Sequence, residues 1–174
     1  MNTFEGKLKI DMGDKFGIVV SRFNEFVTEK LLDGCLQTLI NNGVAEKQID
    51  IVKVPGTFEI PMMAGSLVDL EKYSVIICLG CVIRGETSHY DHLCTAVSNE
   101  LCRLGTESGV PVIFGILTCE NVGQAMDRTG GSRGNKGSES ALAAIEMVSV
   151  IKKINNQDCS ASHTIETESA NLSA

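Results

Sequence analysis

The sequence has no tryptophan, only two tyrosines and six phenylalanines in 174 residues, and fewer lysines and arginines (15) than aspartates and glutamates (22). Its net charge is −7 at pH 7, and no basic run is interleaved with aromatic residues. These features exclude a surface that follows the phosphates of a nucleic acid. An anionic substrate must therefore be bound by a few cations at particular positions.

Long apolar runs are missing as well. No segment reaches the roughly 18 consecutive apolar residues of a membrane span, and the opening residues MNTFEGKLKIDMGDK lack the apolar core of a signal peptide. We therefore expect a cytoplasmic protein. The length and the 43% share of hydrophobic residues suit one globular domain, which we expect over residues 1–154.

The seven cysteines are odd in number, and most lie in apolar periodic segments, which favours buried, reduced thiols over disulfides. Cys78 and Cys81 form a CxxC pair. On a strand these two side chains point to opposite faces, so they cannot easily bind one metal ion. We predict no metal site.

Apolar segments with strand and helix character alternate along the chain. Residues 74–83 (SVIICLGCVI) show no alternation of polar and apolar positions, so both faces of this strand should be covered, as in a parallel sheet. The pattern predicts an α/β protein with three layers, helices on both faces of the sheet and right-handed crossovers. The expected strands are 15–21, 49–54, 73–83 and 111–117, and the expected helices are 25–42, 58–70, 88–107, 120–128 and 138 to about 154.

The two ends of the chain differ from this pattern. Residues 155–174 are polar and rich in serine and threonine, which predicts a disordered tail. Residues 1–12 have too few apolar groups for a core strand, but they suit an arm that adds to a sheet edge, including that of a neighbouring subunit.

The buried run 74–83 ends in the polar sequence RGETSHYD, where the carboxyl end of a parallel strand is expected. Ligands bind at that edge in open α/β sheets. His89 is a candidate acid or base because imidazole titrates near neutral pH, although a solvated helix-surface histidine is the alternative. A metal site using His89, Asp91 and His92 is disfavoured, because these positions do not share one face of a helix.

Two segments are candidate anion sites. In the turn before residue 88, Gly85 lets the backbone approach a ligand beside Glu86 and Thr87, and free helix amides attract an anion, although Thr87 is equally suited to cap the helix. The loop GGSRGNKG (130–137) also opens a helix. Lys136 lies between asparagine and glycine, which does not fit the Walker motif, and a flexible solvated loop is the alternative.

Phe23, Phe58 and Phe114 all lie next to predicted strand ends in this aromatic-poor chain. Their placement indicates a stacking pocket for a flat ring, and core packing is the alternative. Arg128 is either a helix-capping cation or the fixed charge for a phosphate. Glu59 sits at a helix start, where a carboxylate also interacts favourably with the helix dipole.

Five motifs that follow one another along the chain are more specific than any of these residues alone. They are SRFNE (21–25), VPGTFEIP (54–61), GCVIRGETSHYD (80–91), PVIFGILT (111–118) and GNKGSESALAAIEM (134–147). Together they closely resemble the lumazine synthase family, whose members catalyse the penultimate step of riboflavin biosynthesis. The resemblance runs from about residue 4 to 154. Thr57 stands where the family commonly has alanine, and the tail is longer than usual.

The resemblance implies a flavodoxin-like, four-stranded parallel sheet of order 2-1-3-4. It implies condensation of 5-amino-6-(D-ribitylamino)uracil with 3,4-dihydroxy-2-butanone 4-phosphate, with release of phosphate and water and without metal or organic cofactor. The family forms homopentamers, some of which close into sixty-subunit icosahedral shells, with active sites between subunits. The compact loop before the last helix resembles that of shell-forming members, for which riboflavin synthase is a possible enclosed partner.

The same resemblance implies roles for individual residues. His89 would move protons, Gly85, Glu86 and Thr87 would bind the phosphate, and a neighbouring subunit would supply Arg128, with Lys136 and Glu139 nearby. The pyrimidine and ribityl chain would be held by Phe23, Thr57, Phe58, Glu59, Cys81, Val82 and Ile83, and by Phe114 of the neighbour. A shell protein without catalysis and a flavin- or pterin-binding module remain alternatives, against which the retained Phe23, His89, Arg128 and Lys136 argue.

Overall fold

The computed structural model describes the backbone of residues 1–171 and the side chains of residues 1–156. The strands are β1 (Phe16–Ser21), β2 (Ile49–Val54), β3 (Val75–Ile83), β4 (Val112–Cys119), β5 (Thr129–Gly131) and β6 (Gly134–Asn135). The α-helices are α1 (Glu25–Asn41), α2 (Ile60–Val68), α3 (His89–Ser108), α4 (Val122–Asp127) and α5 (Lys136–Asn171).

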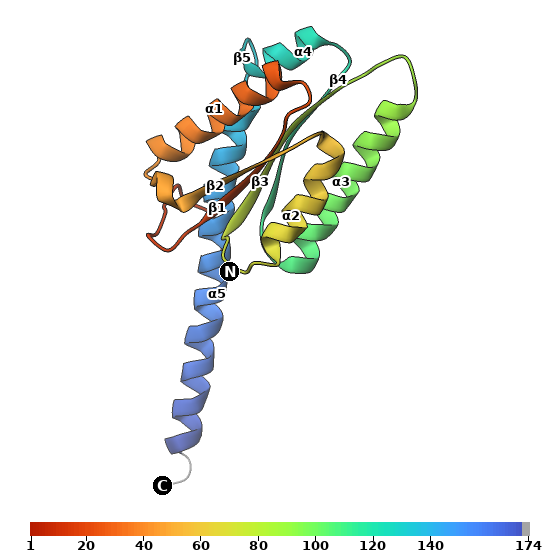
Figure 1. Cartoon of the computed structure of the whole chain (residues 1–174). Helices are drawn as coiled ribbons and strands as arrows, with labels where there is room; N and C mark the ends of the chain where they lie inside the picture. The colour runs from red at the N-terminus through yellow and green to blue at the C-terminus, as the bar shows by residue number, and fades with distance from the viewer. Residues whose placement is uncertain (172–174) are drawn as a thin grey trace.

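Strands β1 to β4 form one parallel sheet in the order β2-β1-β3-β4. Helices α1 and α5 cover one face and α2 and α3 the other, so the molecule has three layers (Figure 1). This confirms the predicted α/β/α class, the flavodoxin-like sheet and its order. Because all four strands are parallel, their carboxyl ends, and the loops that follow them, lie along one edge.

The core consists of two apolar clusters separated by the sheet. Phe16 and Ile18 of β1 pack in the cluster under α1 and α5, whereas Val19 packs in the cluster under α2 and α3. Strand β3 is buried from Val75 to Cys81 and contributes to both clusters. The absence of alternation in its sequence therefore has the predicted cause, which is coverage of both faces.

Helices α1 and α5 approach closely where glycines leave out a side chain. A Cβ atom on Gly137 would lie 1.9 Å from the carbonyl oxygen of Leu31, and one on Gly34 would lie 2.5 Å from the side chain of Asn135. Asn135 caps the start of α5, because its Oδ1 accepts the amide of Gly137 at 2.8 Å, and its Nδ2 donates to the carbonyl of Lys30 at 2.9 Å. The loop before α5 is thereby fixed against α1.

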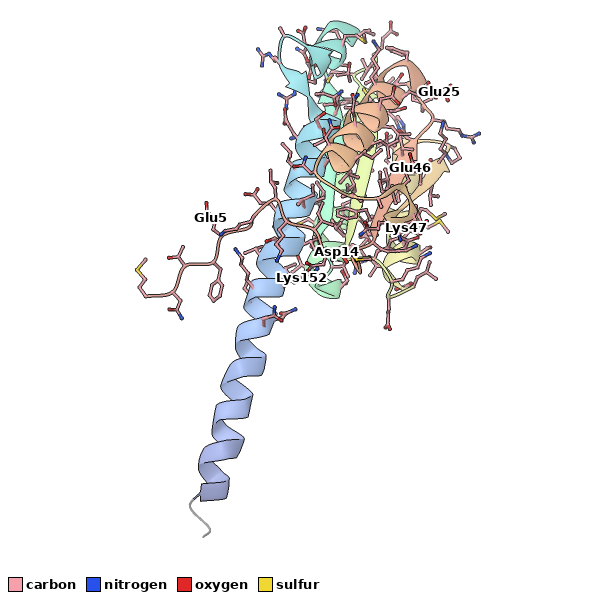
Figure 2. The ribbon with its side chains drawn as sticks, turned by 90° about the vertical axis from the view of Figure 1, so that its left-hand side faces the viewer. Glu5, Asp14, Glu25, Glu46, Lys47 and Lys152 are labelled. Atoms are coloured by element: carbon pink, nitrogen blue, oxygen red, sulfur yellow. The ribbon has the colours of Figure 1, made fainter. Side chains whose placement is uncertain are left out.

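A buried carboxylate joins the start of β1 to α5. Asp14 is 2% exposed, and its Oδ1 lies 2.5 Å from Nζ of Lys152. Its Oδ2 accepts the amide of Asp11 at 2.8 Å, and Gln48 donates to its backbone carbonyl at 2.8 Å. Figure 2 shows Asp14 and Lys152 side by side at the point where the N-terminal segment meets α5.

The N-terminal arm crosses α5 and projects beyond it (Figure 2), and it forms no strand within the described part of the chain. The amide of Lys7 donates to Oγ of Ser149 at 3.1 Å, and Nζ of Lys153 donates to the carbonyl of Glu5 at 2.6 Å. Addition of this arm to a neighbouring subunit's sheet stays a prediction.

Some element boundaries differ from those expected. The segment before α2 is a short 3₁₀ turn (Thr57–Glu59) rather than the first turn of an α-helix, and the glycine loop contains the small antiparallel pair β5–β6. Helix α5 continues to Asn171, beyond the expected end near Ile154. Residues 172–174, and side chains from residue 157 on, lie outside the described part, so the disordered tail over 155–174 stays a prediction.

The thiols follow the burial pattern only in part. Cys78 and Cys81 are buried on opposite faces of the sheet, as predicted. Cys102 is exposed and Cys94 is half-buried on α3, so burial was overestimated there, and Cys159 lies outside the described side chains. None of the helices in the described chain is apolar over a length that would span a bilayer.

We predict that Gly137→Ala destabilises the protein. The added methyl would overlap the backbone of Leu31, so the α1–α5 contact must open, at a cost of about 1–3 kcal/mol or more in the free energy of unfolding. Urea unfolding followed by circular dichroism measures this change. Gly13→Ala is the matched control, because a Cβ there meets no atom within 4 Å; equal stability of the two variants would contradict the prediction.

Candidate active site

An apolar cavity of about 330 Å³ opens at the carboxyl edge of the sheet, between the ends of β1, β2 and β3 and the start of α3. We refer to it as the ring pocket. It is lined by Phe23, Gly56, Thr57, Phe58, Glu59, Cys81, Val82, Ile83, His89, Tyr90 and Leu93.

Two exposed phenylalanines lie at this pocket. Phe23 is 70% and Phe58 62% exposed, so core packing does not account for either. Phe23 is held by its turn, since its amide donates to the carbonyl of Pro55 at 3.0 Å. The next residue, Asn24, has a left-handed backbone (φ 60°) and donates from Nδ2 to the carbonyl of Cys81 at 3.0 Å, which ties the β1–α1 turn to β3.

The turn after β2 provides a second wall of the ring pocket. Thr57 is buried and faces Gly80 of β3, where an added Cβ would lie 3.1 Å from the threonine Oγ1. Glu59 lines the pocket, and its Oε2 also accepts the amide of Gly56 at 2.9 Å. That bond closes the 3₁₀ turn, so the carboxylate has a local structural partner as well as access to the pocket.

The segment 85–88 between β3 and α3 is exposed and sparsely bonded. Within residues 1–171 the backbone amides of 85–88 donate no hydrogen bond to the protein, and the amide of His89 reaches only Oγ1 of Thr87, at 3.4 Å. Ser88, at the N-cap position, makes no side-chain cap. The start of α3 therefore presents free N–H groups beside Glu86 and Thr87, which suits an anion.

A second cavity, of about 460 Å³, lies beside the last four residues of β4 and next to α4. We call it the cationic pocket, because Arg128, Arg133 and Lys136 line it together with Asp127. Glu139 forms ion pairs with two of these cations, with its Oε2 3.4 Å from Nη2 of Arg128 and 3.3 Å from Nζ of Lys136. Both cationic side chains are about one-third exposed, at 33% and 32%, which leaves them accessible to a ligand.

Phe114 lies in neither of these cavities. It is on β4, is 38% exposed and lines a separate groove of about 340 Å³ with Leu101 and Cys102 of α3. The single chain therefore brings Phe23, Phe58 and His89 together but separates them from Phe114 and from the cations of the second cavity.

The thiol in the ring pocket is not a nucleophile. Cys81 is 1% exposed, and its burial raises the pKa of the thiol to about 12. The thiolate, which is the reactive form, is therefore not populated at neutral pH. Cys81 contributes to the pocket as a small apolar wall.

Some residues that line the two pockets were not among the expected ones. Tyr90 and Leu93 line the ring pocket, and Leu93 lies one helical turn after His89, so the spacing i, i+4 was the signal for a shared face. Arg133, which belongs with Lys136 to the loop GGSRGNKG that the sequence offered as an anion site, lines the cationic pocket. Its position in the glycine-rich loop was visible, but the short β5–β6 pair that orients this loop was not.

The five sequence motifs supply most of the lining of the ring pocket and the free amides at the start of α3. They supply Lys136 to the cationic pocket, whereas Arg128 and Arg133 lie between the fourth and fifth motifs. In a comparison with protein families, the model of the family described as 6,7-dimethyl-8-ribityllumazine synthase matches residues 13–152. This range includes all four strands of the main sheet and every lining residue named above for the ring and cationic pockets. The chain therefore belongs to the 6,7-dimethyl-8-ribityllumazine synthase family.

Proposed function

We propose that the ring pocket and the start of α3 are the place where this chain performs the family's reaction. The chain is a lumazine synthase, a transferase of riboflavin biosynthesis that condenses 5-amino-6-(D-ribitylamino)uracil with 3,4-dihydroxy-2-butanone 4-phosphate. The observation that carries the assignment of the site is the ring pocket, in which two exposed phenylalanines and His89 surround an apolar cavity beside free helix amides.

The ring pocket suits a flat heterocycle. Phe23 offers an exposed face for stacking on the pyrimidine. Phe58, Thr57 and Glu59, which line the same pocket, would surround the other groups of this substrate. Cys81, Val82 and Ile83 would contact the ring mainly through their backbone. The carboxylate of Glu59 is the group placed to accept hydrogen bonds from the ribityl hydroxyls.

The phosphate of the second substrate would bind at Gly85, Glu86 and Thr87, on the free amides before α3. That anion also needs a cation, and the ring pocket contains none within the described residues. Arg128 and Lys136 lie in the other cavity. We infer that the site is completed by a second copy of the chain, which contributes Arg128, Lys136 and Phe114 from its own cationic pocket and β4 groove.

The reaction needs no covalent enzyme intermediate. The 5-amino group of the uracil attacks the ketone, and loss of water gives an imine. Loss of the proton on C3 then expels phosphate from C4, and the resulting enol tautomerises to a ketone at C3. Attack of the ribitylamino nitrogen on this new ketone closes the second ring with loss of another water. Binding the two substrates side by side supplies most of the acceleration, because orientation alone gives large effective concentrations. His89, at the rim of the pocket, would transfer the protons.

Assembly follows from the same inference. A homopentamer places a neighbour beside every site, and the compact loop between β5 and α5 favours closure of pentamers into an icosahedral shell. Such a shell, in the cytoplasm, would have room for riboflavin synthase as an enclosed partner. The reaction as written uses no metal or organic cofactor.

The direct test mixes the purified protein with both substrates and follows the absorbance of the lumazine product. We expect product to form faster than in the mixture without protein, in which the condensation proceeds spontaneously. A rate equal to that background would overturn the assignment of function and favour a shell protein or a ligand-binding module.

We predict that Arg128→Ala impairs mainly the use of the phosphorylated substrate. Loss of one charge-assisted hydrogen bond should raise the KM for the butanone phosphate about ten- to a hundredfold, with the KM for the uracil nearly unchanged. Steady-state kinetics with each substrate varied in turn measures the two KM values separately. Arg103→Ala on the α3 surface is the control. An unchanged KM for the butanone phosphate in Arg128→Ala would contradict the assignment of Arg128 to the phosphate.

We predict a smaller effect for His89→Ala, expressed in kcat rather than in KM. Because proximity carries most of the acceleration, kcat should fall by no more than about a hundredfold, the low end of the range for a general acid or base. His89→Gln, which keeps a hydrogen-bonding group without an imidazole, should resemble the alanine variant. Complete loss of activity in both variants would mean that proton transfer by His89 carries the main barrier.

A further inference from the structure

We propose that Arg84 is a positioning residue, which holds the segment 85–88 and His89 in place without contacting a substrate. This inference rests on the proposed function, in which that segment binds the phosphate. Arg84 immediately follows β3, and its side chain connects the two ends of the segment to each other and to the end of β4.

The contacts of Arg84 use three sides of the guanidinium. Nη1 and Nη2 donate to the two carboxylate oxygens of Asp91 at 2.9 and 2.7 Å, which is a bidentate pair. Nε lies 2.8 Å from Oε2 of Glu120, and the guanidinium carbon lies 4.1 Å from the centre of the Tyr90 ring. The backbone of Arg84 is also connected to the end of β4, because its amide donates to the carbonyl of Cys119 at 2.9 Å.

The pair between Arg84 and Asp91 closes the segment 85–88 into a loop. Arg84 precedes the segment and Asp91 lies in the first turn of α3 after it, so their paired side chains fix both ends. Within the segment itself, the one side-chain bond to the backbone is the long contact from the His89 amide to Thr87. The conformation of 85–88 therefore depends on the pair that brackets it.

Arg84 is also placed between the two cavities. Tyr90, on which it stacks, lines the ring pocket, whereas Cys119, to which its amide donates, lines the cationic pocket. Glu120 begins the turn that leads into α4, and Arg128 is the C-cap residue that follows this helix. One side chain thus sets the spacing of the β3–α3 and β4–α4 turns.

The contacts of Arg84 argue against direct binding of the phosphate by its guanidinium. Two carboxylates already neutralise the guanidinium, and its hydrogen bonds hold the pKa of the Asp91 carboxyl below its usual range, so that this partner stays ionised. Exposed ion pairs of this kind add little to global stability. Their effect should appear in the geometry of the site, where a shift of about 1 Å can cost up to about a hundredfold in rate.

The test compares Arg84→Met with Arg103→Met in the whole protein. Arg103 is the matched control, since it also contacts two carboxylates, those of Glu100 and Glu107, on the surface of α3. We expect Arg84→Met to raise the KM for the butanone phosphate about tenfold and to leave the KM for the uracil within about twofold. Its melting temperature should stay within about 4 °C of the unaltered protein.

Three further variants separate positioning from direct binding. Asp91→Asn and Glu120→Gln each remove one partner and should each raise the same KM about threefold, in the direction of Arg84→Met. Arg84→Lys keeps the charge but loses the fork that matches a carboxylate, so it should not restore the KM. These variants also keep the proposal testable if Arg84→Met fails to fold.

Hydrogen exchange gives a readout that does not need activity. The amides of residues 84, 91 and 92 donate to backbone carbonyls. They should exchange faster in Arg84→Met than in Arg103→Met, even if the protein made no lumazine. The proposal is overturned if exchange is the same in both variants, if Arg84→Lys has a normal KM, or if Asp91→Asn lowers the KM. The last result would mean that the freed guanidinium binds the phosphate itself.

Discussion

Burial of β3 on both faces is the constraint on which the site depends. Helices cover the sheet on either side, and β1 and β4 pair with β3 along its two edges. Within β3, exposure to solvent therefore begins only at the carboxyl end, where Val82 and Ile83 are half-buried. The polar residues that follow are placed together at one edge of the sheet, next to the turns after β1, β2 and β4, and a rigid strand fixes their position.

Much of this was predictable because it follows from local patterns. The unbroken apolar run in residues 74–83 predicted a strand covered on both faces. The strand order came from the resemblance to a family, since periodicity does not determine which strands are neighbours. The β5–β6 pair was missed because a glycine-rich loop has no alternation to read, and the beginning of α2 was misplaced because Gly56 and Glu59 form a tight turn instead.

The site was predictable in its residue types and less so in its geometry. Phe23 and Phe58 were open to core packing from sequence alone, and only their exposure in the structure separates the two interpretations. The sequence also did not indicate that Arg84, Asp91 and Glu120 come together, because the pairing depends on how β3 and β4 are aligned. The separation of His89 from Arg128 into different cavities is the geometric reason to infer a site shared between copies of the chain.

The most direct test of a shared site mixes two impaired variants, Phe23→Ala and Arg128→Ala, by unfolding and refolding them together, with the assay at a butanone phosphate concentration well below the KM of Arg128→Ala. If each site takes Phe23 from one subunit and Arg128 from its neighbour, mixed assemblies contain some sites with both residues intact. Lumazine formation should then exceed the sum of the two variants assayed separately. Activity no higher than that sum, in assemblies shown by native mass spectrometry to contain both variants, would contradict the account.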